Sequence, residues 1–394
     1  MRVAIIADDL TGAADTGVQL ARAGYRTAVA FRGAPIPPSE DLDAVALDTD
    51  SRAMPPGFAA KRVISASRAV RDAPILYKKL DSTLRGPVAA ELSAALGVSG
   101  RDRAIVAPAF PAAGRTTADG VQLVRGVPVH ETEARDDPRT PVREGHLPTL
   151  LAAAFPSVVS LGTGDLADPA TVRRALDEAV CVVADAASDE DLEALVRAVR
   201  DPDRVLWAGS AGLAVALGAV YPGPSAATAH PRSAPAGRVL VVVGSLSAVA
   251  RKQLSALEEH GCAAVPVVAG TPGEALGAAR AALVGGACVA LHSAEDRAAS
   301  DAGAVVGGLA EAVTALSEEG LFDALVLTGG ETAVGVARRL GAVGILLAGE
   351  VEPGIPVGTL IGPKPYGVVT KAGAFGEAGT LVGAVETLLT GWER

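Results

Sequence analysis

Short apolar runs alternate with helix-spaced segments along almost the whole of this 394-residue chain. Val3–Ala7 is a continuous apolar run, Thr11–Ala23 has helical spacing, and Thr27–Phe31 is apolar again. This order of strand, helix and strand predicts parallel sheets that are covered by helices on both faces. Further strands are predicted at Ala44–Leu47, Ile75–Tyr77, Ala104–Ala107, Val180–Ala184, Val205–Ala208, Val239–Val243, Ala263–Val268, Ala287–His292, Ala324–Thr328 and Val368–Lys371. The predicted fold class is α/β.

A break in composition divides this pattern. Residues 222–237 are rich in proline and small residues and have no hydrophobic period, which is typical of a linker or a surface crossing. The length of the chain also suggests more than one domain. We therefore predict two domains, residues 1–230 and 231–394, each built on a mainly parallel sheet with helices on both faces.

Composition limits the kind of partner. Hydrophobic residues make up 49% of the chain and charged residues 20%, which allows a sizeable core. A net charge of −10 argues against nucleic acid or an anionic membrane as a partner. The N-terminus lacks the layout of a signal peptide and no long apolar span is evident, so we expect a cytoplasmic protein.

The three cysteines, Cys181, Cys262 and Cys288, are far apart in the sequence and odd in number. This spacing favours a reducing compartment and predicts no disulfide framework. We expect each cysteine to be a small core residue.

Polar side chains follow several predicted strands, and ligands of open parallel sheets bind at the carboxyl ends of the strands. Asp8 and Asp9 come directly after the first strand. Adjacent carboxylates of this kind hold a metal, accept a proton or bind sugar hydroxyls. The alternative is that one of them only caps the helix that begins near Thr11.

The segment from Lys79 to Gly86 forms a second polar group, in which basic residues flank Asp81 and Ser82. Arg85 is suited to a bidentate grip on a carboxylate and Lys79 to a point-charge contact. In an acidic protein this pattern indicates a carboxylate or phosphate ligand, although a solvated basic face is the simpler reading. Ser82 or Thr83 could also cap the helix expected from Val88.

Two further loops follow predicted strands. Residues 48–52 combine aspartates with Ser51 and Arg52, and a plain turn is the competing interpretation. Arg115 lies in a glycine-flanked loop with threonines and Asp119. His130 has no partner at metal-ligand spacing, so a zinc site is not expected.

The second half of the chain carries three turns of glycine and hydroxyl residues: 244–247, 329–333 and 370–376, the last with Lys371. Each turn joins a predicted strand to a helical pattern. Glycine lets the backbone approach a ligand, and a helix N-terminus suits phosphate. None of them is a P-loop or a clean G-x-G-x-x-G motif. A loop that needs glycine for its geometry alone remains an alternative for each turn taken singly.

Six segments together resemble one family, the four-carbon acid sugar kinases. These ATP-dependent enzymes phosphorylate tetronates such as threonate, erythronate or their 3-oxo forms. The resemblance covers nearly the whole chain and depends on residues 7–17, 79–86, 108–117, 244–247, 328–332 and 370–376, in that order.

The resemblance implies an N-terminal domain for the sugar acid and a C-terminal domain for ATP. The predicted sugar-acid residues are Asp8, Asp9, Lys79, Asp81, Ser82, Arg85 and Arg115. The predicted nucleotide residues are Ser245, Gly329, Gly330, Glu331, Thr332, Ala333, Lys371 and Gly373.

The expected reaction transfers phosphate from ATP to the terminal C4 hydroxyl, giving the 4-phosphate. Asp9 or Asp8 would accept the hydroxyl proton, and Mg²⁺ would bridge the ATP phosphates. The metal ligands stay open, with Glu331 a weak candidate, and a homodimer is one expectation for the assembly. Closure of two domains could exclude water during transfer.

Two other functions compete with the kinase. A non-catalytic sugar-acid-binding protein would need the N-terminal polar residues but not the glycine turns. A dehydrogenase would need a dinucleotide fingerprint, whereas the first strand here ends in two aspartates. The sequence does not indicate which tetronate is used.

Overall fold

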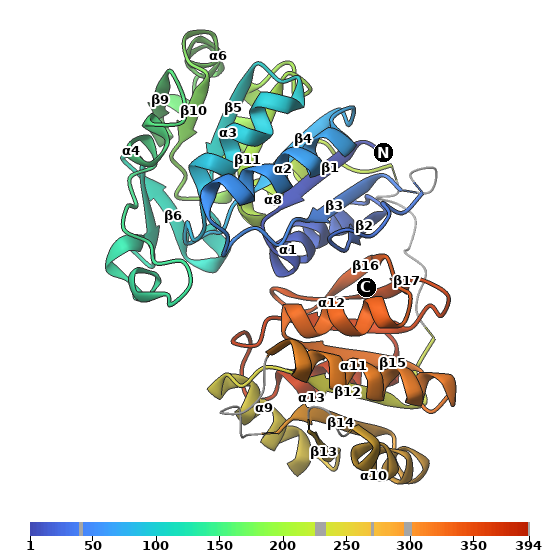
Figure 1. Ribbon diagram of the computed structural model, residues 1–394. Coiled ribbons are helices and arrows are strands. Elements are labelled where there is room, and N and C mark those ends of the chain that lie inside the picture. Colours follow the sequence, from blue (N-terminus) through green and yellow to red (C-terminus); the bar gives the residue numbers. More distant parts are fainter. Residues whose placement is uncertain (39–41, 225–233, 269–271, 295–301, 393–394) are drawn as a thin grey trace. The chain divides into compact units, whose positions relative to one another are not determined.

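The computed structural model describes residues 1–38, 42–224, 234–268, 272–294 and 302–392. By contacts, the chain divides into two compact units (Figure 1). The first is Met1–Arg32 with Pro38–Thr228, and the second is Gly33–Pro37 with Ala229–Arg394. The domain boundary predicted near residue 230 falls in residues 225–233, outside the described part.

The first unit is built on a sheet whose strands all pair in parallel. Its strand order is β2 (Thr27–Ala30), β3 (Ala44–Asp48), β1 (Val3–Ala7), β4 (Ile75–Lys79), β11 (Val205–Gly209), β5 (Arg103–Ala107), β10 (Cys181–Ala184) and β9 (Val158–Leu161). Burial on both faces explains why β1, β3, β4 and β11 are buried along their whole length.

Helices cover both faces of this sheet, because right-handed crossovers that run in opposite directions along a sheet place their helices on opposite sides. On one face, α2 (Pro56–Val70) packs on α3 (Val88–Ser99). On the other, a row is formed by α1 (Leu10–Arg22), α8 (Ala211–Val220), α7 (Asp189–Ala198) and α6 (Pro169–Glu178). The short helices α4 (Leu147–Ala152) and α5 (Thr163–Leu166) lie near β9.

A small antiparallel sheet, absent from the sequence prediction, is attached to the first unit. It consists of β6 (Arg115–Ala118), β7 (Val121–Val124) and β8 (Val127–Pro128), and 3₁₀ turns at Pro111–Ala113, Val129–Glu131 and Glu133–Asp136 flank it. Its strands are short and only partly buried, so they carry little apolar signal.

The second unit has a mixed sheet. Its order is β13 (Ala263–Val267), β14 (Cys288–Ser293), β12 (Val239–Val243), β15 (Ala324–Thr328), β18 (Gly367–Lys371), β17 (Ile355–Ile361) and β16 (Gly344–Glu352). The strands from β13 to β18 are parallel, whereas β16 and β17 form an antiparallel hairpin beside β18. The prediction missed this hairpin, although the fold class, α/β with mainly parallel pairing, is confirmed.

Helices also cover both faces of the second sheet. On one face α9 (Ala248–Glu259) packs on α13 (Thr380–Thr390), and on the other α11 (Ala302–Glu318) packs between α10 (Pro272–Gly285) and α12 (Gly330–Arg339). The last helix, α13, joins the core of its own unit through Leu381, Ala384, Val385 and Leu388. No helix within the described ranges is both long and apolar enough to cross a bilayer.

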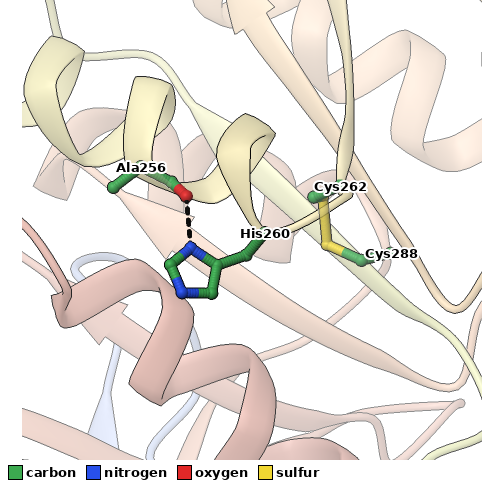
Figure 2. The surroundings of a disulfide bond; sticks show 4 residues. All are labelled: Ala256, His260, Cys262 and Cys288. Carbon is green, nitrogen blue, oxygen red and sulfur yellow. Dashed lines mark hydrogen bonds between the residues drawn. A yellow bond between two sulfur atoms is a disulfide. The ribbon is translucent and has the colours of Figure 1, made fainter.

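The prediction that no cysteine is disulfide-bonded was wrong for two of the three residues, whereas the predicted core position of Cys262 is confirmed. Cys262 and Cys288 form a disulfide with a Cα–Cα distance of 4.9 Å (Figure 2). The register pairs Ala263 with Val289, so Cys262, the residue before β13, lies opposite Cys288, the first residue of the neighbouring parallel strand β14. Their sequence separation of 26 residues conceals this adjacency, which only the strand order creates. Cys181 is the buried core thiol expected, and burial raises its pKa to about 12.

Candidate functional site

Three polar loops meet at one edge of the first sheet. β3, β1 and β4 are neighbours, with Ala7 paired to Asp48 and Ile6 paired to Lys78. Parallel pairing brings the carboxyl ends of the strands to the same edge. Residues 8–9, 48–52 and 79–86 therefore lie together. We call Asp8, Asp9, Arg52, Lys79 and Asp81 the charged cluster.

Arg52 is the centre of the charged cluster. Its guanidinium donates to both oxygens of Asp8, at 2.6 and 3.1 Å, and to both oxygens of Asp9, at 2.6 and 2.8 Å. Its Nη2 also lies 3.6 Å from Asp81 Oδ1. The planar fork of an arginine makes such paired contacts, which fix geometry as well as charge. One cation thus holds three carboxylates in place.

The two adjacent aspartates differ in exposure and in the direction in which their pKa values are shifted. The side chain of Asp8 is 4% exposed and that of Asp9 is 27% exposed. Burial opposes the ionisation of Asp8, but Arg52, Lys78 and Lys79 outweigh it and lower its pKa. Burial also dominates at Asp9, where the charge of Asp8 adds to it, and the pKa of Asp9 is raised. Asp9 is therefore the more accessible and the more basic carboxylate.

Asp9 is also the N-cap residue of α1, which begins at Leu10. Its Oδ1 accepts a hydrogen bond of 2.7 Å from the Gly12 amide, so the capping role weighed from the sequence is present. The cap and the contacts with Arg52 use the same carboxylate. The helix start thus fixes the orientation of Asp9 within the cluster.

Asp81 is held by its own loop. Arg85 donates to both of its oxygens at 2.8 and 3.0 Å, and Thr83 Oγ1 donates at 2.5 Å. Burial opposes ionisation, yet Arg52 and Arg85 together hold the pKa of Asp81 well below its ordinary value. Arg85 also reaches Asp137 at 3.5 Å. The carboxylate that Arg85 clamps here belongs to the protein, and its predicted grip on a ligand stays a prediction.

The loops that carry Arg52 and Arg85 each contain a residue with strained backbone. Asp50 has φ 47° and Leu84 has φ 60°, both in the left-handed region that non-glycine residues rarely adopt. The predicted cap of α3 by Ser82 or Thr83 is wrong, because α3 begins at Val88 with Pro87 before it and has no side-chain cap. Thr83 turns back to Asp81 instead.

Buried polar groups next to the charged cluster hold its residues in place. Lys78 is fully buried and its Nζ lies 2.9 Å from Glu91 Oε2. Glu91 Oε1 accepts a 2.5 Å hydrogen bond from Ser51, the residue before Arg52. Lys79 is 4% exposed and its Nζ donates to the Leu80 carbonyl at 2.8 Å. Breaking such buried pairs is costly, so this network fixes the position of Arg52.

The remaining predicted sugar-acid residues, Ser82 and Arg115, are not members of the charged cluster. The Ser82 carbonyl accepts a 2.8 Å hydrogen bond from Gln122, a buried side chain of β7. Arg115 begins β6 and donates to the Ala113 carbonyl. Within the described ranges, Arg115 forms no hydrogen bond or ion pair with the charged cluster. Its contact with the substrate stays a prediction from the sequence.

The three glycine turns meet at one edge of the second sheet. They follow β12, β15 and β18, which are neighbours in the sheet and parallel. The Gly329 amide donates to the Lys371 carbonyl at 2.9 Å, and Ser247 Oγ donates to the Gly373 carbonyl at 2.7 Å. Hydrogen bonds therefore join all three turns into one surface.

Close packing explains why these turns need glycine. A Cβ on Gly373 would lie 2.1 Å from Ser245 Oγ, and one on Gly244 would lie 1.9 Å from Thr332 Oγ1. Gly329 has φ 101°, a conformation that side chains with a Cβ avoid. By contrast, a Cβ on Gly330 would meet no atom within 4 Å. The backbone at Gly330 thus faces open space at the start of α12.

The other predicted nucleotide residues lie on the same turns. Gly330, Glu331 and Thr332 form the first turn of α12, and the Ala333 amide donates back to the Gly329 carbonyl. Lys371 ends β18 and is 3% exposed. Burial lowers the pKa of Lys371 to about 8, against the opposing effect of Glu352. A helix start and a lysine on glycine turns together suit phosphate.

Comparison with known proteins identifies the family to which this chain belongs. Residues 3–217 match the sugar-binding N-terminal domain, and residues 240–381 match the nucleotide-binding C-terminal domain. A D-threonate kinase of Bordetella bronchiseptica is 39% identical over 98% of this chain and 97% of its own length. A D-erythronate kinase of Heliobacterium modesticaldum is 34% identical over 98% of this chain and 97% of its own.

The chain belongs to the four-carbon acid sugar kinases.

The resemblance inferred from the sequence is thereby confirmed, and this protein is a sugar acid kinase that uses ATP. The crystal structure of a Haemophilus influenzae protein shares its fold, with a TM-score of 0.79 and 22% identity over 98% of this chain and all of that chain. A Bordetella bronchiseptica protein, 36% identical over 99% of each chain with a TM-score of 0.52, was solved with bound citrate as a domain-swapped dimer.

Sequence reasoning missed the central residue of this kinase's charged cluster. Arg52 was noted within a polar loop but was not assigned to the site. Its signal was its position five residues after a predicted strand, which a plain turn explains equally well. Only the adjacency of β3 and β1 shows that the guanidinium reaches Asp8 and Asp9.

Proposed function

We propose that this kinase phosphorylates the C4 hydroxyl of a four-carbon sugar acid, with D-threonate as the first candidate. The charged cluster carries the proposal, since Arg52 presents two aspartates beside Lys79 at the strand ends. A tetronate combines one carboxylate with several hydroxyls, and a mixed cluster of cations and carboxylates complements both. The D-threonate kinase relative, at 39% identity, favours D-threonate over the other tetronates.

Asp9 is proposed as the proton acceptor. Its side chain is the more exposed of the pair, and its raised pKa improves it as a base. The C4 oxygen forms a bond to the γ-phosphorus of ATP while the bond from that phosphorus to the β,γ-bridging oxygen breaks. The hydroxyl proton passes to Asp9, and ADP leaves. Arg52 keeps Asp9 oriented and Asp8 ionised.

Lys79 and Arg85 are proposed to neutralise the substrate carboxylate, with Asp81 and Ser82 binding hydroxyls. The glycine turns are proposed to bind the nucleotide through backbone amides at Gly330 to Thr332 and through Lys371. Phosphoryl transfer depends mainly on positioning and on charge neutralisation, which these groups provide.

Mg²⁺ is proposed to enter with ATP. Nowhere in the described ranges do three His, Cys, Asp or Glu residues gather as a metal site. Arginines pair with Asp8, Asp9 and Asp81, which leaves these carboxylates poorly suited to a cation. Magnesium in kinases needs only one or two carboxylates besides the phosphates, and Glu331 lies on the turn 329–333 itself. Bound there, the ion would neutralise charge that develops on the phosphates.

The test is coupled ADP release with ATP and Mg²⁺ against D-threonate, L-threonate, D-erythronate and 3-oxo-tetronate. We expect turnover on one or two tetronates, with D-threonate best, and ³¹P–¹³C coupling at C4 of the product. ATP binding without turnover on any tetronate would refute the acceptor class. Phosphate found on C2 or C3 would refute the C4 assignment.

We also propose a homodimer, since the related Bordetella protein was solved as one. Light scattering of the purified protein tests this. A mass of twice 39.3 kDa is expected, and a monomer at all concentrations would contradict it.

A further inference from the structure

Asp15 lies beside the charged cluster on α1, in the helix that Asp9 caps. It is three residues beyond Gly12, so both are on the same helix face. A Cβ on Gly12 would lie 2.7 Å from Asp9 Oδ1 and 3.1 Å from Lys79 Nζ. The face of α1 that carries Asp15 is therefore the face that packs on the cluster.

The charges of the cluster act on Asp15 in turn. Burial raises the pKa of Asp15 most, Lys79 opposes that effect, and Asp9 and Asp81 add to it. Asp9 follows β1, and Lys79 and Asp81 lie at the end of β4. Asp15 is therefore within electrostatic reach of the carboxyl ends of both strands. Its side chain is only partly buried, which leaves it accessible to a small molecule.

Hydrogen bonding separates Asp15 from the other aspartates. Arg52 occupies Asp8 and Asp9, and Arg85 with Thr83 occupies Asp81. Within the described ranges the Asp15 carboxylate accepts no hydrogen bond and forms no ion pair, and only its backbone carbonyl is used, by Gln19. A partly buried carboxylate without a protein donor gains from any donor that a ligand brings.

We infer that Asp15 accepts a hydrogen bond from the C2 or C3 hydroxyl of the sugar acid and so helps to select its hydroxyl pattern. This inference depends on the proposed function. A hydroxyl suits the position better than the substrate carboxylate does, because Asp15 and its acidic neighbours repel a second anion. Lys79, which Asp15 shares with the cluster, limits the cost of keeping this carboxylate ionised.

The experiment compares Asp15→Ala and Asp15→Asn with the unaltered enzyme on the best tetronate and on analogues that lack the C2 or the C3 hydroxyl. On the full substrate we expect kcat/KM of Asp15→Ala to fall about a hundredfold, as when a buried hydroxyl contact is lost. On the analogue without the contacted hydroxyl, the same variant should lose less than about threefold. Asp15→Asn keeps the shape and an acceptor oxygen. Its kcat/KM on the full substrate should lie between the values of Asp15→Ala and of the unaltered enzyme.

Asp168→Ala is the matched control, since Asp168 caps the distant helix α6. An equal loss on every substrate, or no loss, would overturn the role of Asp15 while the kinase activity stands. An unaltered enzyme that turns over no tetronate would overturn the proposed function together with this inference. If Asp15→Ala unfolds, Asp15→Asn carries the comparison, with urea unfolding as the check on folding.

Discussion

The two units build their ligand surfaces from different materials. At the charged cluster the chemistry lies in side chains, with Arg52 holding Asp8 and Asp9 through four hydrogen bonds. At the glycine turns it lies in the backbone, where Gly244 and Gly373 pack too closely for any Cβ. The charged cluster offers both cations and carboxylates, so it can distinguish the hydroxyls of a ligand from its carboxylate. The glycine turns offer backbone amides, which fit phosphates that are the same in every nucleotide.

This contrast predicts opposite sensitivities. The charged cluster should tolerate small changes of shape but fail when a charge is removed. The glycine turns should tolerate the loss of a charge but fail when a methyl group is added. Variants that remove one of these properties from one unit test the contrast.

The largest effect is expected from Asp9→Asn. Asparagine retains the cap of α1 but cannot accept the hydroxyl proton, so kcat should fall about a thousandfold, within the usual range for a general base. Steady-state kinetics on the best tetronate measures it. Asp168→Asn, at the exposed cap of α6, is the control. Near-normal turnover in Asp9→Asn would exclude Asp9 as the base.

The next effect is expected from Arg52→Ala. It leaves Asp8 and Asp9 without their shared cation, and loss of one partner of a buried pair costs about 3 kcal/mol of unfolding free energy. Urea unfolding measures this cost. Arg204→Ala breaks an exposed pair with Asp102 and should cost far less, because solvent screens such a pair. Equal costs for the two variants would contradict the central role of Arg52.

A smaller effect is expected from Gly373→Ala. The added Cβ would lie 2.6 Å from Ser245 Cβ, so the turn must shift, at a cost of about 1–3 kcal/mol. Affinity for ATP should fall about tenfold or more, which calorimetry measures. Gly277→Ala on α10, where a Cβ meets nothing within 4 Å, should leave ATP affinity unchanged. Normal ATP binding in Gly373→Ala would separate this turn from the nucleotide.

The smallest effect concerns pH. Lys371 is a cation below its pKa of about 8 and neutral above it, so ATP affinity should fall between pH 7 and pH 9. The expected change is about fivefold, or about 1 kcal/mol, as for two charges about 4 Å apart in water. Because the folded pKa is lowered, the unfolded chain binds more protons between pH 8 and 10.5, and stability rises with pH there.

Lys371→Met should flatten the pH dependence of ATP affinity. Lys364→Met removes a lysine that donates to the Ser317 carbonyl and serves as its control. A pH dependence that persists unchanged in Lys371→Met would assign the titration to another group.

The sequence predicted what local pattern controls. Buried parallel strands are continuous apolar runs, so β1, β12 and β15 were found with correct bounds. The glycine turns and the aspartate pair were found because each lies within a few residues of a strand end. The small sheet of β6 to β8 lacks this apolar signal and was missed. The hairpin of β16 and β17 was also missed, although both of its strands contain buried apolar residues.

What the sequence could not supply is adjacency between distant segments. Arg52 lies 43 residues from Asp9, and Cys262 lies 26 residues from Cys288. Strand order alone brings each pair together. Asp15 was overlooked for a different reason, since a lone aspartate within an amphipathic helix is ordinarily a solvated residue and only the packing of α1 shows its neighbours.

The most direct test of the account is calorimetric titration of Arg52→Ala and Gly373→Ala with the tetronate and, separately, with a non-hydrolysable ATP analogue. We predict that Arg52→Ala loses tetronate binding but keeps the nucleotide, and that Gly373→Ala does the reverse. Loss of tetronate binding in Gly373→Ala with ATP binding intact, or the converse in Arg52→Ala, would contradict the assignment of the two surfaces.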